Sequence, residues 1–138
     1  MQLVLVRHAE AAPGQPDELR PLTPAGREQA RELGARLRTE GLRAGIVLTS
    51  PLLRARETGR LIARELGAEV TVAEELAPGA TPEAIRRAVR SAPPGPGEAV
   101  VAVGHQPDCG RIVAALTGGP EPPFPPAGSV AIRLERPA

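Results

Sequence analysis

The stretch Leu3-Val4-Leu5-Val6-Arg7-His8 is an uninterrupted apolar run that ends in two polar residues. A short run of Leu and Val without polar residues is typical of a strand buried on both faces, as in parallel sheets. Arg7 and His8 then lie at the carboxyl end of that strand. Ligands of open α/β sheets bind at this end, because loops and helix amino termini converge there. These two residues are therefore the first candidates for a functional site.

The rest of the chain alternates between short apolar runs and amphipathic stretches. Thr23-Pro24, Ser50-Pro51 and Thr81-Pro82 each combine a helix-capping residue with a proline suited to the first turn. The last apolar run alternates with polar residues, which indicates a half-exposed edge strand. The pattern predicts one α/β domain over residues 1–138, a three-layer α/β/α sandwich whose mostly parallel sheet of about five strands has an antiparallel edge strand. We predict strands over residues 3–6, 46–48, 70–72, 99–103 and 130–134, and helices over residues 24–40, 51–66, 82–90 and 107–116.

The composition narrows the classes of partner and compartment. The net charge is only +1 and Phe124 is the sole aromatic residue, so we expect neither nucleic acid nor a membrane surface as a partner. No apolar run reaches the roughly 18 residues of a membrane span, and no cationic leader precedes the first strand. With a single cysteine, Cys109, this predicts a cytoplasmic protein. The lack of Lys and Asn beside 17 prolines suggests a thermophilic origin.

Unusual polar residues follow four successive strands of the predicted sheet. A single histidine after a strand is more often structural than catalytic. This chain has only two histidines, however, and both are expected at the same edge together with two arginines, which favours a functional site. The residues concerned are Arg7 and His8 after the first strand, Ser50 and Arg54 after the second, Glu74 and Glu75 after the third, and His105 after the fourth.

These residue types favour phosphoryl chemistry. The paired N–H groups of an arginine guanidinium match the oxygens of a phosphate, and a helix that starts near Ser50-Pro51 would add backbone N–H donors. Imidazole is a competent phosphoryl acceptor near neutral pH, where much of it is unprotonated. We therefore predict that His8 is the nucleophile, and that Arg7, Arg54 and a protonated His105 stabilise the phosphoryl group during transfer.

Other kinds of site find little support in the sequence. Two histidines without a Cys or carboxylate at ligand spacing make a poor metal site, so we expect no metal. The P-loop motif needs a lysine, and the chain has none. A dinucleotide site would need a Gly-rich fingerprint after the first strand, which is also missing.

Four motifs in this order resemble a known family. They are Arg7-His8 after Leu-Val-Leu-Val; Leu22-Thr23-x-x-Gly26-x-x-Gln29-Ala30; Ser50-Pro51-Leu52-Leu53-Arg54-Ala55-x-x-Thr58; and Val103-Gly104-His105. From Met1 to about Leu116 the chain is similar to the histidine phosphatase superfamily, which includes the phosphoglycerate mutases. The resemblance implies that His8 is transiently phosphorylated, that Arg7 and Arg54 bind the phosphoryl group, and that His105 completes the pocket. It also implies that no metal or organic cofactor is needed.

Three positions fit the family pattern less closely. The proton donor of many members lies in a Glu-x-x-x-Gly stretch, which Glu75 and Gly79 match loosely; Glu74 is the alternative, and either carboxylate can simply be solvated. Arg20 is placed to bind substrate or is a surface arginine. The family usually has Gly after the nucleophile, and here Ala9 would restrict the backbone if that position requires a positive φ.

The length of the chain bears on the reaction. Larger members of the family cover the site with an insertion after the third strand, whereas only residues 76–80 follow Glu75 before the next helix cap. An open site favours hydrolysis over a mutase reaction, which must keep water away from the intermediate. The chain thus resembles the small SixA-type phosphohistidine phosphatases, which implies a phosphohistidine-bearing protein as substrate. The alternatives are a phosphatase for sugar or nucleotide phosphates, and a non-catalytic module that binds a phosphorylated ligand.

Overall fold

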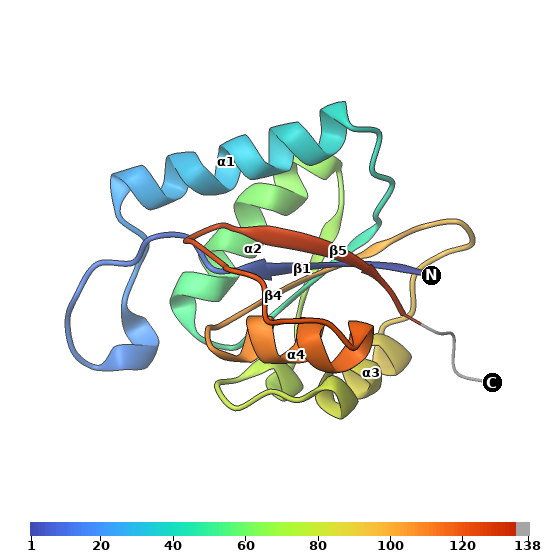
Figure 1. Ribbon diagram of the computed structural model, residues 1–138. Helices are drawn as coiled ribbons and strands as arrows, with labels where there is room; N and C mark the ends of the chain where they lie inside the picture. Colours follow the sequence, from blue (N-terminus) through green and yellow to red (C-terminus); the bar gives the residue numbers. More distant parts are fainter. Residues whose placement is uncertain (135–138) are drawn as a thin grey trace.

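The computed structural model describes residues 1–134, so the last four residues of the predicted domain lie outside the described residues. Strands and helices alternate along the chain, with two short 3-10 helices, η1 and η2, that the sequence patterns do not predict (Figure 1). The elements are β1 (Gln2–Arg7), η1 (Asp17–Leu19), α1 (Pro24–Thr39), β2 (Ile46–Thr49), α2 (Leu53–Leu66), β3 (Glu69–Val72), η2 (Glu74–Leu76), α3 (Pro82–Ser91), β4 (Val100–Gly104), α4 (Asp108–Thr117) and β5 (Ser129–Arg133).

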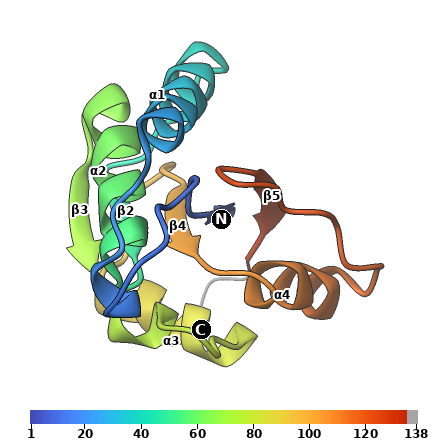
Figure 2. The ribbon, with the colours of Figure 1, turned by 90° about the vertical axis from the view of Figure 1, so that its left-hand side faces the viewer.

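The five strands form one sheet in the order β3-β2-β4-β1-β5. All neighbouring pairs are parallel except β1 and β5, which are antiparallel. Figure 2 shows β3 and β5 at opposite edges of this sheet. The predicted mostly parallel sheet with an antiparallel edge strand is confirmed.

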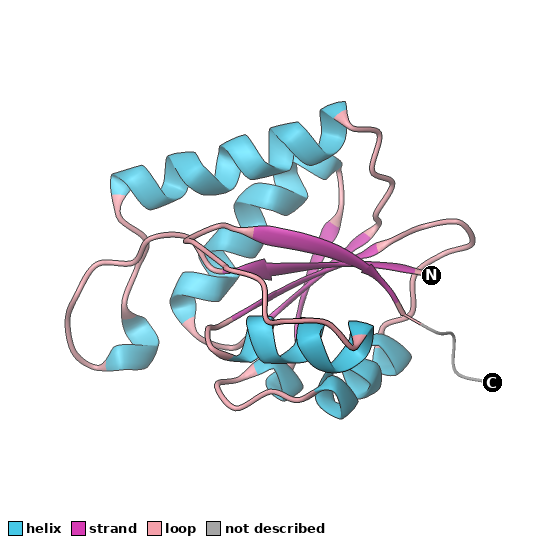
Figure 3. Ribbon diagram, in the orientation of Figure 1, coloured by secondary structure: helices cyan, strands magenta, loops and turns pink. Residues whose placement is uncertain are grey.

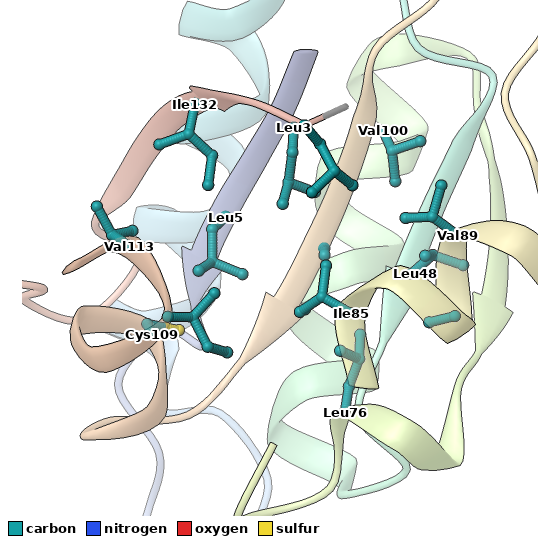
Figure 4. Packing of buried hydrophobic residues seen from close by; sticks show 14 of the residues in the cluster. Leu3, Leu5, Leu48, Leu76, Ile85, Val89, Val100, Cys109, Val113 and Ile132 are labelled. Atoms are coloured by element: carbon teal, nitrogen blue, oxygen red, sulfur yellow. The ribbon is translucent and has the colours of Figure 1, made fainter. Parts of the chain in front are cut away.

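Helices cover both faces of the sheet, which gives the predicted three layers (Figure 3). Side chains of β1 alternate between two cores: Val4 and Val6 pack with α1 and α2, whereas Leu3 and Leu5 pack with α3 and α4. Figure 4 shows the second core around Leu3 and Leu5. Within residues 1–134, no helix combines the length and apolar character needed to cross a membrane.

One predicted helix start is wrong. Thr23 and Thr81 cap α1 and α3 as expected, because each hydroxyl accepts a hydrogen bond from the backbone N–H three residues on. The hydroxyl of Ser50 instead accepts from Leu52 N at 3.2 Å, which closes a turn, and α2 begins only at Leu53. The other predicted helices and strands lie within one residue of the observed bounds.

Gly26 lets the first turn of α1 lie directly on the segment that follows β1. The carbonyl oxygen of Glu10 accepts a hydrogen bond from Thr23 N at 3.0 Å. A Cβ atom on Gly26 would lie 2.1 Å from that same oxygen, so any side chain here would force the two backbones apart. The glycine therefore fixes the position of the residues next to His8.

We expect Gly26→Ala to destabilise the fold by about 1 to 3 kcal/mol, the usual cost of overpacking, although alanine is the better helix former. Urea unfolding followed by circular dichroism measures the change. Gly119→Ala is the control, because the new Cβ would lie no closer than 3.6 Å to its nearest neighbour, Thr117 Oγ1, and it should change stability by less than about 0.5 kcal/mol. A Gly26→Ala variant as stable as the wild type would show that the contact with Glu10 does not constrain the chain.

Candidate active site

The two histidines meet where β1 and β4 end side by side. Arg7 pairs with Gly104 in the parallel register, and the next amide, His8 N, donates to Gly104 O at 3.0 Å. The imidazole rings of His8 and His105 consequently lie with centroids 5.3 Å apart and planes tilted by 57°. The structure therefore brings together the two histidines that the sequence places at this edge.

The ring of His8 is held in an orientation that suits a nucleophile. Its Nδ1 donates to the carbonyl oxygen of Ala9 at 2.7 Å, so the proton of a neutral ring resides on Nδ1 and the lone pair on Nε2. Burial lowers the pKa of His8 from 6.5 to about 4. The hydrogen bond to Ala9 opposes this effect, and the nearby guanidinium groups of Arg54, Arg7 and Arg20 add to it. His8 is therefore neutral near pH 7.

His105 is also neutral, contrary to the protonated form expected from the sequence. Its pKa is lowered to about 4, mainly by burial and in addition by His8, where that ring is protonated, and by the charge of Arg54. Its Nε2 lies 2.7 Å from Ser50 Oγ, which also accepts a hydrogen bond from Leu52 N. When the Ser50 hydroxyl donates to Nε2, the neutral ring carries its hydrogen on Nδ1. That nitrogen is buried and has no hydrogen-bond partner among residues 1–134.

Arg7 is held by a segment that the sequence predicts only as a connecting link. Its Nη1 donates to Phe124 O at 3.0 Å, and its backbone N donates to Gly128 O. Ala127 N in turn donates to His8 O at 3.2 Å. The Pro-rich segment before β5 thus forms a wall of the site. Apart from its single aromatic residue, nothing in its sequence indicates this role.

Arg54 lies in the first turn of α2 and is buried, with 7% of its surface exposed. The backbone carbonyl of Arg54 accepts from Thr58 Oγ1 at 2.7 Å, and the same hydroxyl accepts from Ala9 N at 3.0 Å. Thr58 therefore links Arg54 to the residue after His8. Among the described residues other than glycine, only Ala127 has a positive φ. Ala9 therefore does not adopt this conformation. Alanine is thus compatible with this backbone.

A loop between β1 and α1 brings a carboxylate to the site that sequence reasoning missed. Asp17 Oδ2 lies 3.3 Å from Arg54 Nη2, and Asp17 Oδ1 lies 3.0 Å from Arg20 Nη1. Arg20 also donates through Nε to Ala12 O at 2.8 Å, which braces the loop. Arg20 is close enough for its charge to lower the pKa of His8, but its contact with substrate stays a prediction.

Glu74 and Glu75 lie in η2, directly after β3 at the same edge of the sheet. Glu75 is half-buried and Glu74 is exposed. The following loop is fixed by Asp108, whose carboxylate accepts from Gly79 N and Ala80 N at 2.8 and 3.2 Å. Within residues 1–134, no hydrogen bond or ion pair joins Glu75 to the histidines, so its role as proton donor stays a prediction.

Other hollows of the molecule lack such chemistry. Two at the amino ends of the strands are lined by residues such as Met1 and Pro94, or Arg43 and Glu98, and contain neither histidine. We therefore place the site by its side chains rather than by the size of a cavity. In the described part of the chain, no three His, Cys, Asp or Glu side chains are grouped as metal ligands.

Because the chain contains only two histidines, NMR titration measures both pKa values directly. We expect both near 4 without ligand, and higher in the presence of tungstate, because a bound oxyanion favours the imidazolium form. His8→Asn should raise the pKa of His105 by removing a neighbouring charge. A value above 6 for either unliganded histidine would contradict this account of the site.

The same two pKa values predict how stability depends on pH. Between pH 6.5 and about 4 the unfolded chain binds protons at both histidines and the folded protein does not. The free energy of unfolding should therefore fall as the pH is lowered through this range, by at most about 3 kcal/mol for each histidine. Urea unfolding at a series of pH values measures this fall, which should be smaller in His8→Asn.

Several solved structures with a similar fold are phosphatases. The structure is similar to the protein histidine phosphatase SixA complexed with tungstate, with a TM-score of 0.86 and 28% identity over 98% of this chain and 89% of that one. It is also similar to a putative phosphohistidine phosphatase SixA from Nakamurella multipartitia, with a TM-score of 0.67 and 34% identity over 78% and 60% of the two chains. A mycobacterial glucosyl-3-phosphoglycerate phosphatase, with a TM-score of 0.71 and 20% identity over 94% and 88% of the two chains, shares the fold.

Sequence comparison identifies the family. An uncharacterized protein of Picosynechococcus sp. is 37% identical over 86% of this chain and 74% of its own length. The mitochondrial serine/threonine-protein phosphatase Pgam5 of Drosophila persimilis is 38% identical over 54% of this chain, but the match spans only 26% of that protein. The model of the histidine phosphatase superfamily (branch 1) matches residues 3–78, which contain Arg7, His8 and Arg54. This chain therefore belongs to the histidine phosphatase superfamily.

Proposed function

We propose that this protein is a phosphatase that forms a phosphohistidine intermediate at His8 and removes phosphoryl groups from phosphohistidine on other proteins. The observation that carries the reaction is the state of His8: a neutral imidazole whose Nδ1 is occupied by Ala9 O, so that Nε2 is available as the nucleophile. Arg7 and Arg54 lie close enough for their charges to act on this ring, as a binding site for the phosphoryl group requires.

The reaction follows from this arrangement. His8 Nε2 attacks phosphorus as the bond to the leaving group breaks, and water then attacks phospho-His8 to release inorganic phosphate and restore the imidazole. Charge on the transferred oxygens is stabilised by Arg7 and Arg54. Two buried donors are suited to the same oxygens: Arg7 Nε and His105 Nδ1, neither of which has a partner among the described residues. A phosphoryl dianion would also raise the pKa of His105, so that it can become a stronger donor once substrate is bound.

Two features favour phosphohistidine on a protein over small phosphoesters. The similarity to the protein histidine phosphatase SixA extends over 98% of this chain. Between β3 and α3 there are only η2 and a short loop, so this segment contains no insertion that could cover the site. The small-molecule alternative draws on structures that are about 20% identical, which share the fold alone. A non-catalytic role would not require the prepared nucleophile.

Trapping the intermediate tests the mechanism. After brief mixing with a radiolabelled phosphohistidine peptide and an acid-free quench, we expect label on His8 of the wild type, stable in base and labile in acid. His8→Asn should carry no label and keep no more than a few per cent of kcat, with an unchanged circular dichroism spectrum, because a residue at a strand end contributes little packing. His105→Asn should still become labelled, more slowly. Label that persists in His8→Asn would rule out His8 as the nucleophile.

Glu75→Gln tests the role of the acid and the class of substrate together. The imidazole of a phosphohistidine leaves readily once its ring is protonated, whereas an alkoxide needs a positioned acid. The variant should therefore barely change kcat/KM for a phosphohistidine peptide, and should lower any activity on alkyl phosphates by roughly ten- to a hundredfold. Glu74→Gln is the matched comparison: it should change neither activity if Glu75 is the donor, and a loss of alkyl phosphatase activity there alone would assign the acid to Glu74. A wild type that prefers an alkyl phosphate and loses that activity in Glu75→Gln would favour the small-molecule alternative.

A further inference from the structure

Within residues 1–134, Asp17 is the one carboxylate that forms an ion pair with Arg54, an arginine proposed to bind the phosphoryl group. Its backbone oxygen accepts from Arg54 Nη1 at 3.0 Å, and its Oδ2 lies 3.3 Å from Arg54 Nη2. Its other carboxylate oxygen lies 3.0 Å from Arg20 Nη1. Two guanidinium groups therefore fix the position of this side chain.

The ion pair spans the boundary between the site and solvent. The side chain of Arg54 is 9% exposed, whereas that of Asp17 is 54% exposed, so the carboxylate lies on the outer side of the buried arginine. Figures 1 and 2 show the loop that carries Asp17, coloured blue, beyond the carboxyl ends of the strands and next to the start of α2. The charge of Asp17 also acts on His105, which places it within electrostatic reach of the reacting groups.

This carboxylate is poorly placed for a general acid and well placed for a fixed charge. The hydrogen bond from Arg20 is the main reason why the pKa of Asp17 lies below its usual value, so the group stays ionised near neutral pH. Among the described residues, Asp17 is the carboxylate that forms an ion pair with Arg54, so its negative charge lies beside that arginine. A negative charge there attracts a substrate whose ring is protonated and therefore cationic, and it repels a substrate that carries an anionic group next to the phosphoryl group.

We propose that Asp17 is a specificity-determining residue that selects phosphoryl groups attached to a protonated nitrogen ring, by accepting a hydrogen bond from the distal N–H of a substrate phosphohistidine. This inference rests on the proposed function and adds the chemical basis of its selectivity. As His8 Nε2 bonds to phosphorus, the P–N bond breaks and its electron pair returns to the substrate ring. That ring leaves as neutral imidazole, because the proton on its distal nitrogen is already present, and Asp17 neither gives nor takes a proton.

Asp17→Asn tests the proposal, because the amide keeps a similar shape and removes the charge. We expect kcat/KM for a phosphohistidine peptide to fall roughly twofold to fivefold, in keeping with an exposed charge pair. For 3-phosphoglycerate, whose carboxylate is repelled by Asp17, kcat/KM should rise by a similar factor. Glu18→Gln is the matched control: Glu18 is an exposed acid of the same 3-10 helix and forms no ion pair in the described residues, so the ratio of the two substrates should not change.

Inhibition by inorganic phosphate provides a readout that does not depend on turnover. If Asp17 acts by its charge, phosphate should bind Asp17→Asn severalfold more tightly, whereas loss of a merely structural contact with Arg54 would weaken binding. Equal falls in kcat/KM for both substrates, equal rises for both, or the same effect in Glu18→Gln would overturn the proposal. A wild type that turns over 3-phosphoglycerate but no phosphohistidine peptide would overturn the proposed function as well. If the wild type is active on the peptide and Asp17→Asn has the same selectivity, only the role of Asp17 is overturned.

Discussion

The parallel pairing of β1 with β4 is the constraint on which the site depends. Because Arg7 pairs with Gly104, each strand ends at the same level and each is followed by a histidine. A shift of the register by one residue would turn the side chains of β1 to the opposite faces and exchange the two cores that Leu3 and Val4 enter. The packing of apolar side chains on both faces of the sheet therefore also sets the 5.3 Å separation of the two rings.

Burial and positive charge act together on His8 and His105. Both histidines are largely removed from water beside Arg7 and Arg54, and this combination disfavours a proton on either ring. In the proposed function the arginines have two effects: they would bind a phosphoryl dianion, and they help to keep Nε2 of His8 unprotonated before that dianion binds. Asp17 carries a negative charge on the outer side of Arg54, where we propose that the leaving group binds.

Local sequence signals predicted the elements where local contacts decide the structure. Thr23 and Thr81 cap helices because a hydroxyl and an amide three residues on lie close in sequence. The same signal failed at Ser50, whose hydroxyl contacts both Leu52 N and the imidazole of His105, a residue far away in the sequence. The Pro-rich segment around Phe124 likewise gives no sign of its contact with Arg7, since that hydrogen bond uses a backbone carbonyl that every residue type possesses.

The sequence by itself determined the alternation of strands and helices, the edge at which polar residues gather, and the four side chains Arg7, His8, Arg54 and His105, because apolar periodicity and strand ends are local properties. Only the tertiary structure decided the protonation of the histidines and the partners of the arginines. The pKa of a ring depends on burial and on charges that come from separate segments. In the same way, the sequence shows Asp17 only as an acidic residue in a polar loop. It lies at the site because folding brings η1 against α2, where its carboxylate forms an ion pair with Arg54.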